Sequence, residues 1–267
     1  MPGSGLRLLC LDIESAPCAV LTWSLFDQHR IADEMMREPG YTLCIAWRWI
    51  GRRGGTKFKV LRRRASKPID LRALRQIHRL MSVADGIVTF NGDNYDLPIL
   101  NREFLEAGLK PPAPPQSVDL YKVVRKKFRF ASGKMSYVSK RLGVTKKAPS
   151  PGIECWIGCM AGEPKAWKKM ETYNRRDALV TEALYKRLLP WIDRHPNAGL
   201  VAYGGRPKQD DPNRPLCPRC AGVKLNRVGR VRTKTAEYQR YQCYRCGYWS
   251  RDRKNILAKD RKARVLA

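Results

Sequence analysis

The alternation of apolar and polar positions near the start of the chain predicts a buried strand that ends in two acidic residues. Residues 7–15 read RLLCLDIES, a run dominated by Leu and Ile. Because side chains alternate between the two faces of a strand, we expect Asp12 and Glu14 on the same face. Neighbouring carboxylates repel each other, and a divalent cation is the strongest candidate to compensate their charge. The alternative is a strand end whose acidic residues face water.

The next stretch of the chain has the pattern of two more strands, one amphipathic helix and a fourth strand. Aromatic and β-branched residues predict strands at 41–51 and 57–64, with a glycine pair in the hairpin turn between them. With the first strand they are expected to form an antiparallel meander. Apolar residues at helical spacing predict a helix that begins near Pro68 and ends near residue 84, followed by a strand at 86–92.

The middle of the chain alternates between helical and loop-like segments. Residues 97–108 predict a helix directly after the fourth strand, and residues 119–128 and 134–144 predict two short helices with basic outer faces. Residues 144–163 contain five Pro and Gly residues, which predicts a loop. A long helix is predicted at 165–192. This order of strands and helices indicates an α/β domain.

The C-terminal part of the chain has a different pattern. Residues 197–216 are rich in Pro, Gly and polar residues, which predicts a linker. Two Cys-x-x-Cys pairs follow, and the 22 residues between them contain two β-like runs. Four thiolates at this spacing predict one structural Zn²⁺ in closed tetrahedral coordination, which supplies folding energy that so small a segment lacks. The expected zinc ligands are Cys217, Cys220, Cys243 and Cys246.

These patterns divide the chain into four parts. We expect a catalytic domain at 1–196, a linker at 197–216, a zinc ribbon at 217–250 and a basic tail at 251–267. The five cysteines outside the ribbon are expected to be core or incidental residues. Cys155 and Cys159 could alternatively form a pair of metal ligands.

The charge of the chain indicates a polyanionic partner. The 53 Lys and Arg residues outnumber the 24 acidic residues, which gives a net charge of +29. Such an excess favours nucleic acid. The basic residues are spread along the chain instead of lying on one amphipathic helix, which argues against a membrane surface as the partner. Residues 217–267 alone carry a net charge of +12, with Tyr and Trp between the basic residues, as in surfaces that bind nucleic acid.

Two classes of segment are missing from the sequence pattern. The N-terminal residues do not resemble a secretory signal, and no run approaches the roughly 18 apolar residues of a membrane-spanning helix. We therefore expect a soluble protein of the cytoplasm, or of the host cytoplasm if the protein is viral, with no membrane partner. The chain also lacks a phosphate-binding P-loop, so ATP hydrolysis is not expected.

Three acidic sites along the chain could combine into one centre. Asp12 and Glu14 end the first strand, Asp96 lies where the fourth strand meets a helix, and Tyr173 and Asp177 are four residues apart on one helix. Phosphodiester hydrolysis with two cations about 3.5 to 4 Å apart requires such a set of carboxylates. Each site also has a structural interpretation: Asp96 could cap the helix that follows it, and the Tyr and Asp pair could lie on a helix surface.

The motifs of these three sites resemble those of a known group. LDIES, FNGDNYDLPIL and YNRRD resemble the three motifs of the DEDD superfamily of 3′-to-5′ exonucleases in its tyrosine form. The sequence is most similar to the proofreading exonuclease domain of family B DNA polymerases and its stand-alone relatives. The resemblance covers about residues 5–190. It implies a ribonuclease H-like fold, with a mixed sheet flanked by helices, beside the small β-rich ribbon.

The resemblance also implies a role for individual residues. Asp12, Glu14 and Asp177 would bind one Mg²⁺ or Mn²⁺, with Asp12 bridging to a second ion that Asp96 reaches directly or through water. Tyr173 would align the attacking water. The remaining implied residues contact substrate: Asn91 on the single strand, and Lys146 or Lys147 on phosphate.

Two departures limit what can be transferred from the related proteins. Tyr95 stands where the family often has Phe, which is a mild change. The histidine form of the superfamily is excluded, because the position five residues before Asp177 is Thr172. The ribbon is not part of the proofreading domain, so its role does not follow from the resemblance.

We therefore expect a metal-dependent 3′-to-5′ exonuclease that acts on single-stranded 3′ ends of DNA, with a ribbon that aids binding. An exoribonuclease of the same superfamily, a catalytically silent nucleic-acid-binding module and an endonuclease remain alternatives. The chain has no polymerase domain, so any proofreading would need a polymerase or another replication or repair protein as a partner.

Overall fold

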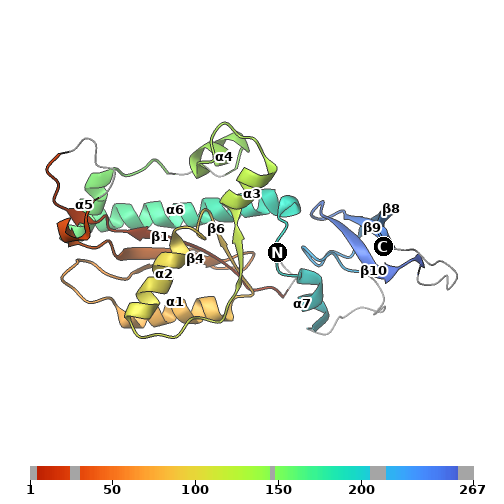
Figure 1. Cartoon of the computed structure of the whole chain (residues 1–267), viewed down its shortest axis with the longest axis horizontal. Coiled ribbons are helices and arrows are strands. Elements are labelled where there is room, and N and C mark those ends of the chain that lie inside the picture. Colours follow the sequence, from red (N-terminus) through yellow and green to blue (C-terminus); the bar gives the residue numbers. More distant parts are fainter. Residues whose placement is uncertain (1–4, 25–30, 145–147, 205–214, 258–267) are drawn as a thin grey trace. The chain divides into compact units, whose positions relative to one another are not determined.

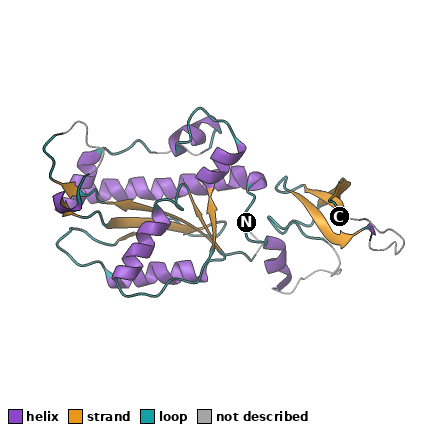
Figure 2. Cartoon of the chain, viewed as in Figure 1, coloured by secondary structure: helices purple, strands orange, loops and turns teal. Residues whose placement is uncertain are grey.

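The computed structural model describes residues 5–24, 31–144, 148–204 and 215–257. The chain divides into two compact units. The larger unit is Leu8–Tyr185, and the smaller combines Met1–Arg7 with Lys186–Ala267. Figure 1 labels the elements, and Figure 2 colours them by type. In the described part of the chain, no helix combines the length and apolar character that crossing a membrane requires.

The larger unit is built on a mixed sheet of five strands in the order β5-β4-β1-β6-β7. β1 pairs antiparallel with β4 and parallel with β6, so it lies at the centre of the sheet. β4 and β5 are antiparallel, and β6 and β7 are parallel. The predicted meander and the mixed α/β fold class are therefore confirmed. The strands are β1 (Leu8–Ser15), β4 (Thr42–Trp49), β5 (Lys57–Val60), β6 (Gly86–Thr89) and β7 (Gln116–Asp119).

Helices cover both faces of this sheet (Figure 1). One apolar cluster joins Leu9, Leu11 and Ile13 of β1 to the helices α1 and α2. The other cluster joins Leu43 and Cys44 to residues of α5 and α6. The alternation along β1 therefore leaves its even-numbered side chains on the side of α6. The helices are α1 (Leu71–Val83), α2 (Asp96–Glu106), α3 (Leu120–Lys127), α4 (Met135–Arg141), α5 (Ile153–Ala161) and α6 (Pro164–Leu188).

The smaller unit contains a second sheet of three antiparallel strands in the order β10-β9-β8. These strands are β8 (Leu225–Arg232), β9 (Glu237–Cys243) and β10 (Trp249–Asn255). The short helices η2 (Leu189–Trp191) and α7 (Ala198–Gly204) precede them. The N–H of Ala198, at the start of α7, donates to the carbonyl of Pro218 at 2.7 Å, which ties this helix to the first Cys-x-x-Cys loop.

Several predicted elements differ from the structure. The segment 144–163, predicted as a loop, contains α5, and the predicted strand 57–64 ends at Val60. The Gly158 that suggested a loop is instead a contact residue, because a Cβ there would lie 2.7 Å from the Cβ of Ala166. The short elements β2 (Ala19–Val20), η1 (Asp33–Met35) and β3 (Met36–Glu38), together with β7 and β10, were not predicted.

The predicted domain boundaries stay a prediction, but two elements differ from the predicted character of these segments. The helix α7 lies within 197–216, where a linker is predicted, and β10 continues past residue 250 into the predicted basic tail. Pairing explains the second difference, because Trp249 to Arg251 of β10 lie opposite Gln242 to Arg240 of β9.

A buried carboxylate joins α2 to the sheet where β1 and β4 change register. The register shifts between Glu14 and Ser15, so that Ser15 lies opposite Thr42. Oε1 of the buried Glu103 accepts a hydrogen bond from the N–H of Thr42 at 2.9 Å. Arg62 lies 3.6 Å from the other carboxylate oxygen of Glu103. Glu103 therefore accepts the hydrogen bond of a main-chain N–H, that of Thr42, which the pairing of the strands does not use.

This arrangement predicts that Glu103→Ala destabilises the fold. The substitution leaves the buried N–H of Thr42 without its acceptor, so the free energy of unfolding should fall by about 1 to 3 kcal/mol. Glu103→Gln keeps an oxygen for Thr42 and should lose less. Denaturant titration measures both values. The control is Glu106→Ala in the same helix, whose exposed side chain should matter little; an equal loss in Glu106→Ala would contradict the proposed role of Glu103.

Candidate active site

The end of β1 presents Asp12 and Glu14 on the face of the sheet that α6 covers. The same face of β1 carries Cys10, whose Sγ lies 3.3 Å from the carbonyl oxygen of Ala178 in α6. The side-chain amide of Asn174 donates to Oδ2 of Asp12 at 2.7 Å and to the Asp12 carbonyl at 3.2 Å. Asn174 is fully buried, so this pair of hydrogen bonds fixes the position of Asp12 relative to α6.

Asp177 completes a cluster of three carboxylates. It lies one turn after Asn174 in α6 and is 2% exposed. One carboxylate oxygen from each of Asp12, Glu14 and Asp177 lies within 4.8 Å of the others. Charges this close repel strongly where water is partly excluded, and carboxylate oxygens are the ligands that Mg²⁺ and Mn²⁺ prefer. This group can therefore bind a divalent cation.

Asp96 approaches the same site from the start of α2. The strand β6 pairs with β1 only as far as Cys10, so the N–H groups further along that edge of β1 need other acceptors. Oδ1 of Asp96 accepts the hydrogen bond of the Ile13 N–H at 2.9 Å. The predicted alternative, in which Asp96 caps the helix, is wrong. Tyr95 holds the cap position, and Asp96 is the first residue of α2.

The pKa of Asp96 is raised to about 7, mainly by burial and to a smaller extent by the nearby charge of Asp119. The hydrogen bond from Ile13 acts in the opposite direction. Burial disfavours the charged form of a carboxyl group, and a bound cation would favour it. The environment of Asp96 is therefore one in which a cation and an ionised carboxylate stabilise each other.

The loop before α2 is held by Asp119, a residue that the sequence did not indicate. Oδ1 of Asp119 accepts hydrogen bonds from the N–H of Asn91 at 2.8 Å and from Tyr121 at 2.9 Å. Asn91 has a φ of 71°, and a Cβ on Gly92 would lie 2.4 Å from Thr89, so the loop needs glycine there. Burial raises the pKa of Asp119.

Asp93, the other acidic residue of this loop, has a different surrounding. It forms an ion pair with Lys122 at 2.7 Å and a short hydrogen bond with Ser117. It does not line the cleft that contains Asp96. Of the two residues, only Asp96, which the sequence analysis assigned to the acidic site, lines the cleft.

The carboxylates open into a cleft of about 520 Å³. Tyr173 of α6, Tyr95 and Asn91 also line it. Tyr173 is 9% exposed, and its ring meets that of Trp156 edge-on at 6.0 Å. Burial raises the pKa of Tyr95. The sequence analysis predicted eight site residues in the larger unit, two of which are Lys146 and Lys147. The other six line one cleft: Asp12, Glu14, Asn91, Asp96, Tyr173 and Asp177.

The opposite wall of the cleft supplies residues that the sequence analysis missed. Lys134 and Ser136 come from the start of α4, and Tyr121 comes from α3. The predicted phosphate-binding residues Lys146 and Lys147 lie outside the described residues. Lys134 is exposed and precedes the first residue of α4. In the sequence, Lys134 follows Gly133 at the start of a predicted helix, and this position could have indicated it as a candidate site residue.

Four buried thiols pack near the acidic cluster. Burial raises the pKa of Cys10 and of Cys44, which lies opposite Glu14 in the sheet. Burial also raises the pKa of Cys155, and that of Cys159 to about 12. Cys155 and Cys159 lie in the apolar cluster of α5 and α6. Thiols in such surroundings stay protonated, which favours the prediction of core residues over a ligand pair.

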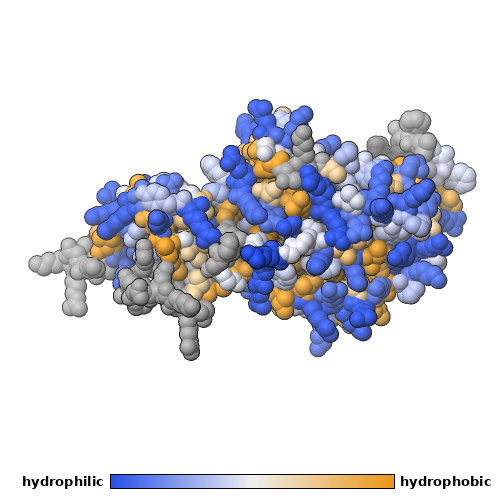
Figure 3. All heavy atoms as spheres, turned by 180° about the vertical axis from the view of Figure 1, so that it is seen from behind, coloured by the Kyte–Doolittle hydropathy of each residue, from blue (hydrophilic) through white to orange (hydrophobic). Residues whose placement is uncertain are grey.

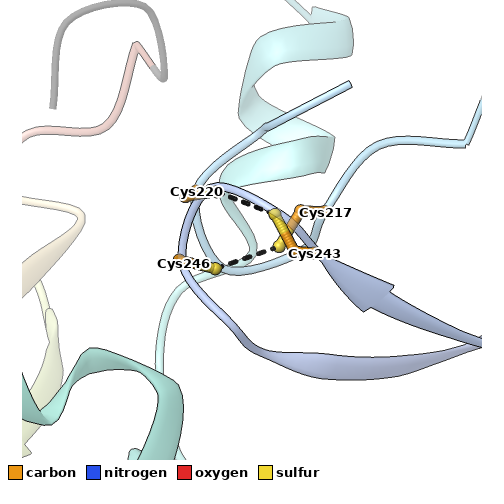
Figure 4. Close-up of side chains that lie close together, drawn as sticks. All are labelled: Cys217, Cys220, Cys243 and Cys246. Atoms are coloured by element: carbon orange, nitrogen blue, oxygen red, sulfur yellow. Dashed lines mark hydrogen bonds between the residues drawn. The ribbon is translucent and has the colours of Figure 1, made fainter. Parts of the chain in front are cut away.

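The four cysteines of the smaller unit point toward one another (Figure 4). The Sγ atoms of Cys217 and Cys246 are 3.6 Å apart, as are those of Cys220 and Cys243. A tetrahedral site with Zn–S bonds of about 2.3 Å has sulfur atoms about 3.8 Å apart, so the observed spacing fits such a site. All four Sγ atoms lie within 4.8 Å of one another. This cluster can bind a metal ion.

Comparisons with known proteins agree with this architecture. No curated protein matches the chain in sequence. One solved structure with a similar fold is that of the family B DNA polymerase from the hyperthermophilic archaeon Pyrobaculum calidifontis, with a TM-score of 0.51 and 18% sequence identity. The alignment covers 86% of this chain and 31% of the polymerase, so the chain spans less than a third of that protein's length. At this identity the likeness shows the fold alone.

A family model describes the central part of the chain. The model of the RNase H superfamily matches residues 33–189, which is more than half of the chain. The match begins after β1, but β1 pairs with both β4 and β6 and is therefore part of the same sheet. The family match supports a nuclease-type function. The chain belongs to the RNase H superfamily.

Proposed function

We propose that the chain is a metal-dependent 3′-to-5′ exonuclease that hydrolyses single-stranded ends of DNA. One observation carries the proposal: oxygens of Asp12, Glu14 and Asp177 lie within 4.8 Å of one another in an open cleft that also contains Asp96. Uncompensated, these charges only destabilise the fold. With cations they become the ligand set of a phosphodiester-cleaving site.

The donor set fits two divalent cations. Asp12, Glu14 and Asp177 would hold the first, Asp12 would bridge to the second, and Asp96 would reach the second directly or through water. When bound, Mg²⁺ or Mn²⁺ supplies positive charge that stabilises the transition state at the scissile phosphate. The role of the chain is then to fix the carboxylates, and the amide of Asn174 does this for Asp12 by occupying its Oδ2.

Tyr173 would position the water molecule that attacks the phosphate. Its ring is held against Trp156, and the side chain lines the cleft together with Asp177. A phenol with an ordinary pKa near 10 is a poor base at neutral pH, so its hydroxyl would orient the water without taking its proton.

The remaining cleft residues suit the binding of a single strand. Asn91 presents its side chain from a loop that Asp119 fixes, and Tyr95 offers a half-exposed ring on which a base can stack. Among the residues that the structure describes, Lys134 lines the cleft, and it would contact phosphate. Lys146 and Lys147 stay predictions.

The charge of the chain supports nucleic acid as the substrate and the ribbon as an aid to binding. In Figure 3 hydrophilic residues cover most of the visible described surface, consistent with the 53 Lys and Arg residues. We favour DNA over RNA because the similar solved structure is that of a DNA polymerase. A polymerase or another replication or repair protein is a proposed partner, since the similar structure is a DNA polymerase of which this chain spans less than a third.

The first test measures cleavage of 5′-labelled single-stranded DNA with Mg²⁺ or Mn²⁺. Wild type should shorten the strand stepwise from its 3′ end, and matched RNA should be shortened more slowly. Asp12→Asn and Asp177→Asn should each lower kcat about a thousand-fold or more, because they remove cation ligands worth several kcal/mol.

Asp93→Asn is the matched control for these variants, because Asp93 lies next to the cleft but does not line it. It should keep activity within a few-fold of wild type. Full activity in Asp12→Asn would refute the proposal, and cleavage of circular DNA would favour an endonuclease.

Tyr173→Phe tests the positioning of water. Loss of the hydroxyl should lower kcat about 10- to 100-fold and leave KM and the cation dependence unchanged, because misplacing a reacting group costs rate without weakening binding. Single-turnover kinetics measure this. Tyr95→Phe, which introduces the residue that relatives often carry, is the control and should behave like wild type. A changed cation dependence in Tyr173→Phe would instead indicate a role in metal binding.

The cysteine cluster predicts one tightly held Zn²⁺ per chain. Elemental analysis of dialysed protein should give about one zinc per chain, and Cys243→Ser should lose it, because three thiolates cannot close the tetrahedral site. Hydrogen exchange should then show loss of protection in β9. The control is Cys18→Ser, since Cys18 is an exposed cysteine far along the chain from the cluster. Retention of zinc by Cys243→Ser would show that the four thiols are not its ligands.

A further inference from the structure

One face of the three-stranded sheet carries a row of arginine and aromatic side chains. In β9 and β10, Arg240 lies directly opposite Arg251, and Gln242 lies opposite Trp249. Directly opposed residues share a face, and so do residues two apart in a strand. Tyr238 and Arg240 are two apart in β9, so Tyr238, Arg240, Trp249 and Arg251 share one face. We refer to these four residues as the Arg–aromatic face.

The two arginines of this face are held by stacking. The guanidinium of Arg240 lies 4.9 Å from the ring centre of Trp249, and that of Arg251 lies 4.1 Å from the ring centre of Tyr238. Nε of Arg240 also donates to the carbonyl of Val228 at 3.2 Å. Stacked guanidinium groups keep in-plane donors for a further acceptor, and less side-chain freedom is lost when they bind one.

The Arg–aromatic face concentrates positive charge that nothing in the described ribbon neutralises. Like charges directly opposite in a sheet repel each other. Within residues 215–257 the acidic residues are Glu237 and Asp252. Glu237 lies on the opposite face, where it binds Arg230 at 3.1 Å and Arg232 at 2.8 Å. Asp252 accepts hydrogen bonds from the main-chain N–H groups of the two residues that follow it.

Another cation–π pair of the smaller unit has a different environment. Arg219 stacks on Tyr248 at 4.3 Å, is buried, and donates to the carbonyls of Ile192 and Asp193. One nitrogen of its guanidinium group donates to both carbonyls within the unit, so we interpret Arg219 as a structural residue. Arg240 and Arg251 are exposed, and so is Trp249.

We propose that the Arg–aromatic face is a binding site for single-stranded nucleic acid. The two guanidinium groups would bind phosphate oxygens and relieve their own repulsion, and bases would stack on the rings of Trp249 and Tyr238. Tyr238 and the position opposite Trp249 lie on either side of the arginine pair, with their backbone positions about 13 Å apart along β9, which suits an extended strand more than a compact anion. This inference rests on the proposed function only in taking nucleic acid as the ligand. The residues of the face lie outside the carboxylate cleft.

The test uses the full chain with Asp12→Asn, so that the strand is not digested, and a fluorescein-labelled 20-nucleotide oligo(dT) followed by anisotropy. Arg240→Gln with Arg251→Gln should weaken binding about 10-fold, and the slope of log affinity against log salt should fall by about 1.4, since each phosphate contact to a single strand contributes about 0.7. Zinc content and circular dichroism verify that each variant is folded.

The matched control removes the same charge from elsewhere in the sheet region. Arg227 lies opposite Tyr241 and therefore on the other face, and Lys234 lies between β8 and β9. Arg227→Gln with Lys234→Gln should bind within about twofold of the parent chain. An equal loss of affinity in both double variants would overturn the proposal, because net charge alone would then explain binding.

A second arm tests the rings. Trp249→Ala and Tyr238→Ala should each weaken binding of oligo(dT) about 5- to 100-fold, the range for loss of one stacked base. An abasic strand of the same length should bind more weakly than oligo(dT) and be insensitive to these two substitutions. Matched RNA should bind comparably to DNA. Equal binding of the abasic strand, or tighter binding of anionic phospholipid vesicles than of oligo(dT), would overturn the proposal.

The two proposals can fail independently. If wild type does not cleave DNA but oligo(dT) binding depends on the Arg–aromatic face, the exonuclease assignment fails and this site stands. If wild type cleaves DNA through Asp12 and Asp177 but the face variants bind oligo(dT) like the parent chain, this site fails and the exonuclease assignment stands.

Discussion

The structure of the larger unit depends on holding mutually repelling carboxylates at a fixed distance. Asp177 follows Asp12 and Glu14 by at least 163 residues in sequence, yet oxygens of the three residues lie within 4.8 Å of one another. The main chain sets this distance: alternation along β1 orients two side chains, and the packing of α6 on the same face brings the third. The buried apolar residues on both sides of the sheet hold these elements against the repulsion. The feature that costs stability without a cation is therefore the feature that enables the site to hold one.

A second constraint explains why acidic residues gather at the ends of the strands. Where a ladder stops, N–H groups remain without partners, and in this unit carboxylates accept them: Asp96 from Ile13, Glu103 from Thr42 and Asp119 from Asn91. Each of these bonds fixes a segment that lines or adjoins the cleft. An acidic residue near a strand end can thus belong to the candidate cation site or can hold the main chain around it. The position of Asp96 allows both, because Asp96 lines the cleft and accepts the hydrogen bond of Ile13.

This distinction marks how far the sequence could predict the site. Periodicity predicted β1, β4, α1 and α6, and the order and spacing of three motifs predicted which carboxylates converge. The sequence did not reveal Asp119, because its role depends on the loop that it binds from the end of the unpredicted β7. The helix α5 was missed because Gly158 resembles a loop signal, whereas it is needed for close contact with Ala166.

The smaller unit has a much smaller apolar core than the larger unit, and its sheet exposes arginine and aromatic side chains. Its core cluster consists of cysteines of the four-thiol group packed against Leu225 and Tyr248, which is too little apolar surface to stabilise a sheet of three strands. If a metal ion supplies that stability through four thiolates, the strands need not bury an apolar face. Aromatic and arginine side chains can then stay at the surface at little cost to folding, as Trp249 and Arg251 do. A ribbon held by metal is in this way free to use its sheet for recognition, whereas the larger unit must use both faces of its sheet for packing.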